Sequence, residues 1–290
     1  MLYLSKEQVK AFFDRLGPQK ATALLSDFFH LYKNYLNSTD LLDIYNDPEY
    51  QKIILKDSEY KIENSQLIIS KNTKYIYEYL ENKVSSSTKI LEVGCGAGDF
   101  CIAIASKNVK KVIGVDISRV SIEIAVEKLN KNNLTNLSFI TGDICDLNFS
   151  EKYDYIVMND VFEHLSDYEL YKIFDKIYGL LDDSSKILLH TPNGYTMWYK
   201  SNMFPIPILR QIVRFLRETF GMSPGLQIYE QSYINQAHIN IKNFYQIKQF
   251  FKKYNYKVSV IYDPHTHSYK SFLNKFRSLS MTVILHKKQI

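Results

Sequence analysis

The feature that most constrains the fold is a run of three alternating glycines that follows a short apolar segment. Residues 89–100 read K-I-L-E-V-G-C-G-A-G-D-F, so an apolar segment broken by one acid, Glu92, leads directly into Gly94, Gly96 and Gly98. This pattern predicts a strand that ends in a tight turn and then a helix. Glycine permits backbone angles closed to other residues and leaves no side chain between the main chain and a ligand. The segment therefore predicts a turn whose bare backbone can contact a bulky ligand.

Apolar segments and helical patterns alternate along the rest of the chain. The expected strands after the glycine turn are 111–117, 137–140, 153–160, 186–190, 256–262 and 281–286, and the expected helices are 99–107, 118–131, 167–181 and 241–254. Such alternation indicates a parallel sheet with helices on both faces, whose ligands bind beyond the carboxyl ends of the strands. With an antiparallel final hairpin, the sequence predicts an α/β fold built on a Rossmann-like, doubly wound sheet of seven strands.

Acidic residues follow two of these strands. Asp116 ends the second strand, where a carboxylate can accept hydrogen bonds from both hydroxyls of a ribose. A helix N-cap or a solvated strand end is the alternative for Asp116. Gly142, Asp143 and Ile144 follow the third strand. These residues and the glycine turn are all expected at the carboxyl ends of strands, where this fold binds its ligands.

The segment E-V-G-C-G-A-G over 92–98 resembles the first motif of class I S-adenosylmethionine-dependent methyltransferases, and its spacing differs from the dinucleotide fingerprint G-x-G-x-x-G. The resemblance implies S-adenosylmethionine as cofactor, with Asp143 beside the adenine and the backbone of Asn159 at the methionine end. Asp146 in place of Asp143, or a plain turn aspartate, remains open. The cofactor-binding residues implied are Glu92, Gly94, Cys95, Gly96, Gly98, Asp116, Ile117, Asp143, Ile144 and Asn159.

The segment N-D-V-F-E-H-L over 159–165 resembles the D/E-x-x-E-H segment of the small-molecule branch typified by the ubiquinone-biosynthesis O-methyltransferases. That resemblance implies that Glu163 and His164 face the methyl acceptor. Adenine N-methyltransferases carry N/D-P-P-Y/F at this position, and the absence of both prolines here disfavours amino methylation of a nucleic-acid base. The resemblance indicates the fold and the cofactor, but it does not identify the acceptor.

Methyl transfer from a sulfonium is an in-line displacement, so the protein mainly positions an acceptor and removes its proton. Histidine suits this task because its ordinary pKa of about 6.5 lies near neutral pH. We expect His164 to be the base, with Glu163 either orienting it or helping it to hold a divalent metal. His190, on the next strand end, is the second catalytic candidate. Structural roles for both histidines remain open, and His265 and His267 are interpreted as part of a surface loop and not as a metal site.

The regions on either side of this core are less informative. Residues 1–83 predict an N-terminal helical region that partly covers the active site or only packs against it, and residues 84–290 predict the methyltransferase domain. An insertion over 195–240 follows the fifth strand and is expected to form a lid or an acceptor pocket. Within it, 204–220 predicts a helix with three arginines on one face. That face could contact an anionic membrane surface or an acidic acceptor, although a covering helix with a solvated basic face is the alternative.

Composition narrows the class of protein. The net charge of +5 comes from interspersed acids and bases, which gives no reason to expect nucleic acid as a partner. Three cysteines without a C-x-x-C pair indicate neither a disulfide framework nor a zinc ribbon. With no leader and no run of about 18 uncharged apolar residues, a cytoplasmic protein is expected. The sequence thus predicts an S-adenosylmethionine-dependent O-methyltransferase of a small molecule, with a sugar or a lipid-linked intermediate as the acceptors considered. An RNA methyltransferase, a dehydrogenase and a non-catalytic binding protein are the alternatives.

Overall fold

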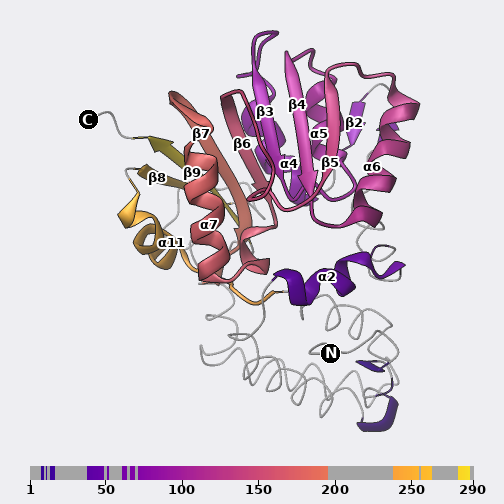
Figure 1. Cartoon of the computed structure of the whole chain (residues 1–290), viewed down its shortest axis with the longest axis vertical. Helices are drawn as coiled ribbons and strands as arrows, with labels where there is room; N and C mark the ends of the chain where they lie inside the picture. The colour runs from indigo at the N-terminus through magenta and orange to yellow at the C-terminus, as the bar shows by residue number, and fades with distance from the viewer. Residues whose placement is uncertain are drawn as a thin grey trace.

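A computed structural model describes most of the predicted domain and parts of the N-terminal region (Figure 1). The described residues are 8–9, 11, 14–16, 38–48, 51, 61–63, 66–68, 71–194, 238–254, 256–262 and 280–287. The basic segment 204–220 and the pair His265 and His267 lie outside them, as does nearly all of the 195–240 insertion. Predictions for those segments therefore stay predictions.

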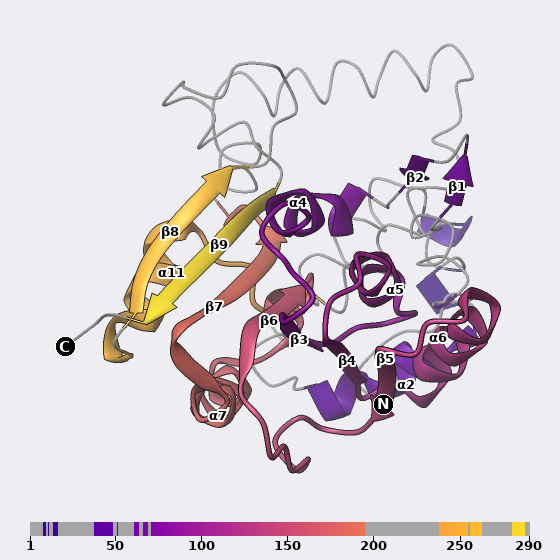
Figure 2. The ribbon, with the colours of Figure 1, turned by 90° about the horizontal axis from the view of Figure 1, so that it is seen from above.

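A seven-stranded sheet forms the centre of the protein and confirms the predicted fold class (Figures 1 and 2). Its strands are β3 (Lys89–Val93), β4 (Lys111–Asp116), β5 (Leu137–Thr141), β6 (Tyr153–Asn159), β7 (Leu181–Pro192), β8 (Tyr256–Tyr262) and β9 (Ser280–Lys287). They lie in the order β5-β4-β3-β6-β7-β9-β8, and β9 alone runs against the other six. The order reverses between β3 and β6, where doubly wound sheets bind their ligands.

Helices cover both faces of this sheet (Figure 2). They are α4 (Lys71–Leu80), α5 (Asp99–Ala105), α6 (Arg119–Asn132), α7 (Asp167–Tyr178) and α11 (Phe244–Phe250), with 3-10 turns η2 (Phe162–His164) and η3 (Phe251–Lys253). Side chains alternate between the faces of a strand, so Ile90 packs in the cluster that holds α4 and α5, whereas Leu91 packs in the cluster that holds α7 and α11. Both β3 side chains are fully buried. The two cores therefore fix the position of the turn that follows β3.

Several element boundaries differ from the sequence-based expectation. The helix expected to reach Leu181 ends at Tyr178, and β7 starts at Leu181 instead of Lys186. The pairing of β6 with β7 shifts register here, and the Ser185 hydroxyl donates to the carbonyl of Tyr153 at 2.7 Å. This side-chain bond lets a polar segment that reads as a loop remain within the strand. The helix expected over 241–254 begins only at Phe244, after a capping box, and tightens into η3.

The N-terminal region is not purely helical where the structure describes it. Beside helix α2 (Ser38–Asn46) and α4, it contains a short hairpin of β1 (Lys61–Glu63) and β2 (Gln66–Ile68), which the helical interpretation missed. Alternation of side chains over three residues is too short to reveal a strand. Among the helices in the described part of the chain, none has the length and apolar character needed to cross a membrane.

Candidate functional site

The glycine turn presents bare main chain at the carboxyl end of β3. Gly94, Gly96 and Gly98 have φ angles of +73°, +50° and +78°, which other residues rarely adopt. A Cβ on Gly94 would lie 2.3 Å from Val161 Cγ2, and one on Gly98 would lie 2.5 Å from Phe139 Cζ. A Cβ on Gly96 would meet nothing within 4 Å. The outer two glycines thus allow close packing within the protein, while Gly96 leaves open space for a ligand.

Asp116 braces this turn from the end of β4. Its Oδ2 accepts a hydrogen bond from the Gly96 N–H and its Oδ1 accepts one from the Ser118 N–H, both at 2.8 Å. Burial raises the pKa of Asp116, and the two main-chain donors oppose that shift. Each carboxylate oxygen keeps a further lone pair. Asp116 therefore lies beside the open space at Gly96, and ribose binding by its carboxylate stays a prediction.

Glu92 lies under the glycine turn rather than on it. Its Oε2 accepts from the Cys101 thiol at 2.9 Å, and its Oε1 accepts from the Asn159 side-chain amide at 2.7 Å. Burial raises the pKa of Glu92 to about 8. Cys95 is also buried, and the Oδ1 of Asn159 has no hydrogen-bond partner among the described residues. Glu92 thus ties the end of β3 to the end of β6, and the backbone of Asn159 follows at the same edge of the sheet.

The third predicted cofactor segment lies next to Asp116. The Gly142 N–H donates to the Asp116 carbonyl at 2.9 Å, which aligns the ends of β4 and β5. Asp143 is exposed and accepts from the Cys145 N–H at 2.9 Å, whereas the Ile144 side chain is buried in the core. Ile117, between Asp116 and the helix, is partly buried. The predicted adenine-side residues therefore line the same sheet edge.

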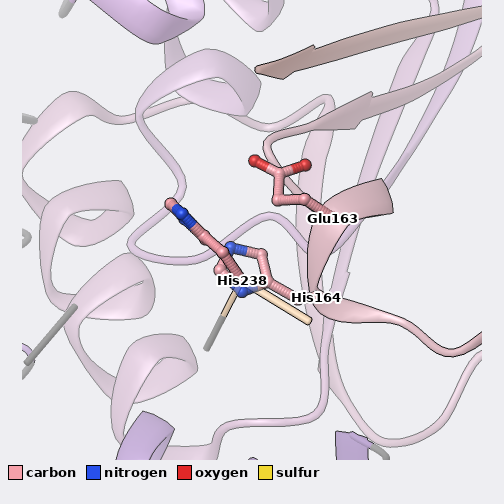
Figure 3. Close-up of side chains that lie close together, drawn as sticks. All are labelled: Glu163, His164 and His238. Carbon is pink, nitrogen blue, oxygen red and sulfur yellow. The ribbon is translucent and has the colours of Figure 1, made fainter. Parts of the chain in front are cut away.

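Turn η2 brings Glu163 and His164 together with a residue from a distant segment, His238 (Figure 3). One potential ligand atom from each of the three side chains lies within 4.8 Å of those from the others. The two histidine rings are 4.8 Å apart between centroids. The Asn240 N–H donates to the Glu163 carbonyl at 2.8 Å, which holds the His238 segment against the turn.

Glu163 is fully buried within this cluster. Its Oε2 accepts from the Thr191 hydroxyl at 3.0 Å, and its Oε1 has no hydrogen-bond partner among the described residues. Burial, with a contribution from the nearby Asp160 charge, raises the pKa of Glu163 to about 8. Burial also lowers the pKa of His238. A buried carboxylate oxygen without a donor, beside two imidazoles, is a set that suits a cation.

His190 and His164 contact different sets of residues. His190 is buried, its Nδ1 lies 2.5 Å from the Asp160 Oδ1, and its ring stacks on Tyr75 at 5.7 Å. Burial by itself raises the pKa of Asp160, but the charge and hydrogen bond of His190, together with the charges of His164 and His238, outweigh burial and lower the pKa. His164 packs instead against His238 and, edge to face at 5.9 Å, against Tyr45.

Helix α2 contacts residues that follow both β4 and β6 at this edge of the sheet. The Ser118 hydroxyl, which caps α6, lies 3.1 Å from the Tyr45 carbonyl and 2.9 Å from Asn46 Oδ1, and these two oxygens share its single proton as acceptors. The Gln51 amide donates to the Ser121 hydroxyl at 2.8 Å. Because the Tyr45 ring also contacts His164, this part of the N-terminal region lies against the sheet edge that carries the predicted site residues.

The sequence analysis assigned none of His238, Asp160, Thr191 and Tyr45 to the site. The one available signal for His238 was its position a few residues before the helix expected near the end of the domain. Nothing in the sequence showed that this segment returns to η2. The contact depends on the tertiary bonds made by Asn240.

Comparisons with known proteins agree with this geometry. Residues 84–251 match the model of a methyltransferase domain. The malonyl-[acyl-carrier protein] O-methyltransferase 1 of Ilyobacter polytropus is 38% identical over 122 residues, covering 41% of this chain and 44% of that protein. The demethylmenaquinone methyltransferase of Staphylococcus carnosus is 25% identical over 183 residues, covering 60% and 70% respectively.

The solved structures share the fold. The magnesium protoporphyrin IX methyltransferase of Synechocystis with bound SAH superposes with a TM-score of 0.55 at 15% identity, over 86% of this chain and 99% of that one. This chain spans less than half the length of the Ilyobacter relative and of the ribosomal protein L11 methyltransferases that it also resembles. Since the domain model covers more than half of the chain and the fold agrees, the protein belongs to the methyltransferase domain family, with the fold of class I S-adenosylmethionine-dependent methyltransferases.

Proposed function

We propose that this protein transfers the methyl group of S-adenosylmethionine to a hydroxyl of a small molecule. The observation that supports this most directly is the juxtaposition of two unlike half-sites at the point where the strand order reverses. One is the open main chain at Gly96 with the Asp116 carboxylate, and the other is the cluster of Glu163, His164 and His238. A methyl donor in the first half-site and a hydroxyl in the second would be adjacent.

The cofactor half-site supplies hydrogen-bond acceptors and an uncovered backbone. Asp116 would accept from the ribose hydroxyls while keeping its bonds to the Gly96 and Ser118 main chain. Asp143 is exposed and would accept from the adenine amine, as the resemblance implies. The Asn159 side chain, which bonds Glu92, leaves its Oδ1 without a partner among the described residues and would accept from the cofactor's methionine ammonium.

The acceptor half-site fits a divalent cation. One carboxylate and two imidazoles form a common ligand set for catalytic metals, which keep further positions open for water or substrate. Ligands about 2.1 Å from an ion are roughly 3.4 Å from one another, so side chains already within 4.8 Å need only small rotations. The cation would be held by Glu163 Oε1 and one nitrogen each of His164 and His238. When bound, it would acidify a coordinated acceptor hydroxyl.

The protein must also align the acceptor with the cofactor and remove the acceptor's proton. The displacement needs the acceptor oxygen in line with the methyl–sulfur bond, and the reactive oxygen must lose its proton. In a site without a cation, His164 would take that proton directly, with Glu163 beside it. The two versions predict different effects of metal removal, and His190, anchored by Asp160, is the less accessible base in either version.

Small-molecule acceptors are supported by three of the proteins named above, which act by their names on malonyl-[acyl-carrier protein], demethylmenaquinone and magnesium protoporphyrin IX. The L11 methyltransferases act by their name on a ribosomal protein. Oxygen as the methylated atom is supported by the buried carboxylate and histidine set, which suits a hydroxyl. A modest net charge of +5 with interspersed acids gives no reason from composition to expect RNA as the acceptor. RNA nevertheless remains the alternative acceptor to be tested.

The cofactor proposal is tested by calorimetry with S-adenosylhomocysteine. Wild type should bind, and Asp116→Ala should bind at least tenfold more weakly because the ribose loses a charged acceptor. Absence of heat with the wild-type protein would overturn the cofactor assignment. Transfer of a labelled methyl group into a small-molecule extract, but not into RNA or protein fractions, would support the acceptor class. Label in RNA would overturn it.

The cation proposal is tested with Co²⁺ followed by visible absorption. His238→Gln should weaken Co²⁺ binding at least tenfold, because one of three protein ligands is lost. His286→Gln is the matched control, since His286 pairs with Lys186, far from the carboxyl end of β7. If His238→Gln and His286→Gln bind Co²⁺ equally and chelators leave turnover unchanged, His164 acts as the base without a cation.

A further inference from the structure

Asp160 has a backbone conformation that requires support from its surroundings. Its φ is +50°, in the left-handed region, at the point where β6 ends and η2 begins. Among the described non-glycine residues only Asn108 and Asn133 also have a positive φ, and Asn133 is the C-cap of α6. Other residues adopt this region when surrounding contacts hold them there, and they concentrate at functional sites. The contacts of Asp160 should therefore reveal what the conformation serves.

Asp160 is bound twice to one residue of the neighbouring strand. Its Oδ1 lies 2.5 Å from His190 Nδ1, and its N–H donates to the His190 carbonyl at 3.0 Å. His190 is itself fixed, because it is buried in β7, is paired with Thr282 of β9 and stacks on Tyr75 of α4 with only 19° between the ring planes. The start of the turn is therefore held by a rigid part of the sheet.

The next residue of β7 holds the other end of the same turn. Thr191 donates to Glu163 Oε2 at 3.0 Å, so consecutive residues of one strand bind Asp160 and Glu163. Val161, between them, packs over Gly94 of the glycine turn. The turn is thus tied to β7 at both ends and is pressed against the cofactor half-site in its middle.

We propose that Asp160 is a positioning residue that, with His190 as its anchor, orients the turn 160–164 so that Glu163 and His164 face His238. This inference rests on the proposed function, because it explains how that donor set is aligned. In this role His190 is a fixed support and not the catalytic base. Partners that orient the ligands of a metal are often as important for affinity as the ligands themselves.

The test uses Asp160→Gly, which tolerates the left-handed backbone while removing the carboxylate that contacts His190. We expect this variant to fold and to bind S-adenosylhomocysteine within about threefold of wild type, because Gly96 and Asp116 are unchanged. Its Co²⁺ affinity should fall by about 10- to 100-fold, and the cobalt spectrum should change. Asp160→Asn, which can still bond His190, should recover part of that loss. Asn133→Gly makes the same backbone change away from the site and should alter neither ligand.

A second readout needs no metal. Amide hydrogen exchange over 161–165 should speed up in Asp160→Gly and stay at the wild-type rate in Asn133→Gly, because only the first variant releases the turn. Unchanged exchange together with unchanged Co²⁺ affinity in Asp160→Gly would overturn the inference. If wild type binds no Co²⁺, the cation proposal fails, and the exchange rates alone then decide whether Asp160 holds the turn.

Discussion

Two alanine substitutions in the glycine turn separate the packing role of a glycine from its ligand role. Gly94 and Gly96 are two residues apart and both have positive φ, so alanine at either position costs about 1–2 kcal/mol for the left-handed backbone. At Gly96 nothing lies within 4 Å of the added methyl group. At Gly94 the methyl group would lie 2.3 Å from Val161 Cγ2, which adds an overpacking cost of about 1–3 kcal/mol.

We therefore expect Gly96→Ala to lower the free energy of unfolding of the unliganded protein by about 1–2 kcal/mol, and Gly94→Ala to lower it by about 2–5 kcal/mol. For ligand binding we expect the opposite ranking, in which Gly96→Ala weakens S-adenosylhomocysteine more than Gly94→Ala does. The Gly96 methyl group would project into the proposed cofactor space, where a clash of about 1–3 kcal/mol weakens S-adenosylhomocysteine roughly 5- to 150-fold. Urea unfolding measures the first quantity, and calorimetry measures the second.

A double substitution provides the control for the packing cost. Val161→Ala shortens the side chain that the Gly94 methyl group would meet, so the Gly94→Ala and Val161→Ala pair should be less destabilising than the sum of the single changes. Wild-type affinity for S-adenosylhomocysteine in Gly96→Ala would refute the reasoning, because the open space at Gly96 would then not be the cofactor cradle. Equal unfolding free energies for Gly94→Ala and Gly96→Ala would refute the packing argument.

Three further outcomes follow from single side chains. Because burial raises the pKa of Glu92 from 4.5 to about 8, the folded protein holds this proton more tightly, so stability should fall as the pH rises between those values by about 1.4 kcal/mol per unit. Glu92→Gln should flatten part of that fall in urea unfolding at pH 6 and pH 8. Lys128→Ala should cost about 1–3 kcal/mol, because it removes the 2.7 Å ion pair of the buried Asp99 carboxylate, whereas Arg119→Ala at an exposed pair should change stability by less than about 0.5 kcal/mol. Ser166→Ala removes the capping box of α7 and should lower the free energy of unfolding by about 1 kcal/mol. Thermal unfolding should show this loss as a lower midpoint temperature.

The glycine turn and the strand ends could be predicted because their signals are local. Alternating glycines after an apolar segment specify a turn, and Asp116 follows its strand directly, so no long-range information is needed to place either at the sheet edge. The helices expected to begin near residues 118 and 167 were also found, and the structure adds that Ser118 and Ser166 are their N-caps. Local pattern was therefore sufficient to place the residues of the proposed cofactor half-site at the sheet edge.

The acceptor half-site could be predicted only in part. Its contacts depend on the register between β6 and β7 and on the packing of the distant His238 segment against η2. Asp160 and His190 were both expected at strand ends, but their contact follows from the register that places Asn159 opposite His190, which pattern does not reveal. His238 reaches Glu163 through the main-chain bond of Asn240, which no periodicity specifies. The sequence identified the residue types of this half-site without showing how they come together.

The topology explains why two such half-sites meet at all. The chain leaves β3 for α5, which packs in the core cluster containing Ile90, and it leaves β6 for α7, which packs in the opposite cluster containing Leu91. Adjacent strands whose connections diverge to opposite faces leave the space beyond their carboxyl ends uncovered by either helix. The glycine turn ends β3 and the 160–164 turn follows β6, and Val161 contacts Gly94 across that space. If the methyl donor binds at the first turn and the acceptor at the second, as proposed, the divergent connections would both leave room for the two molecules and bring them together.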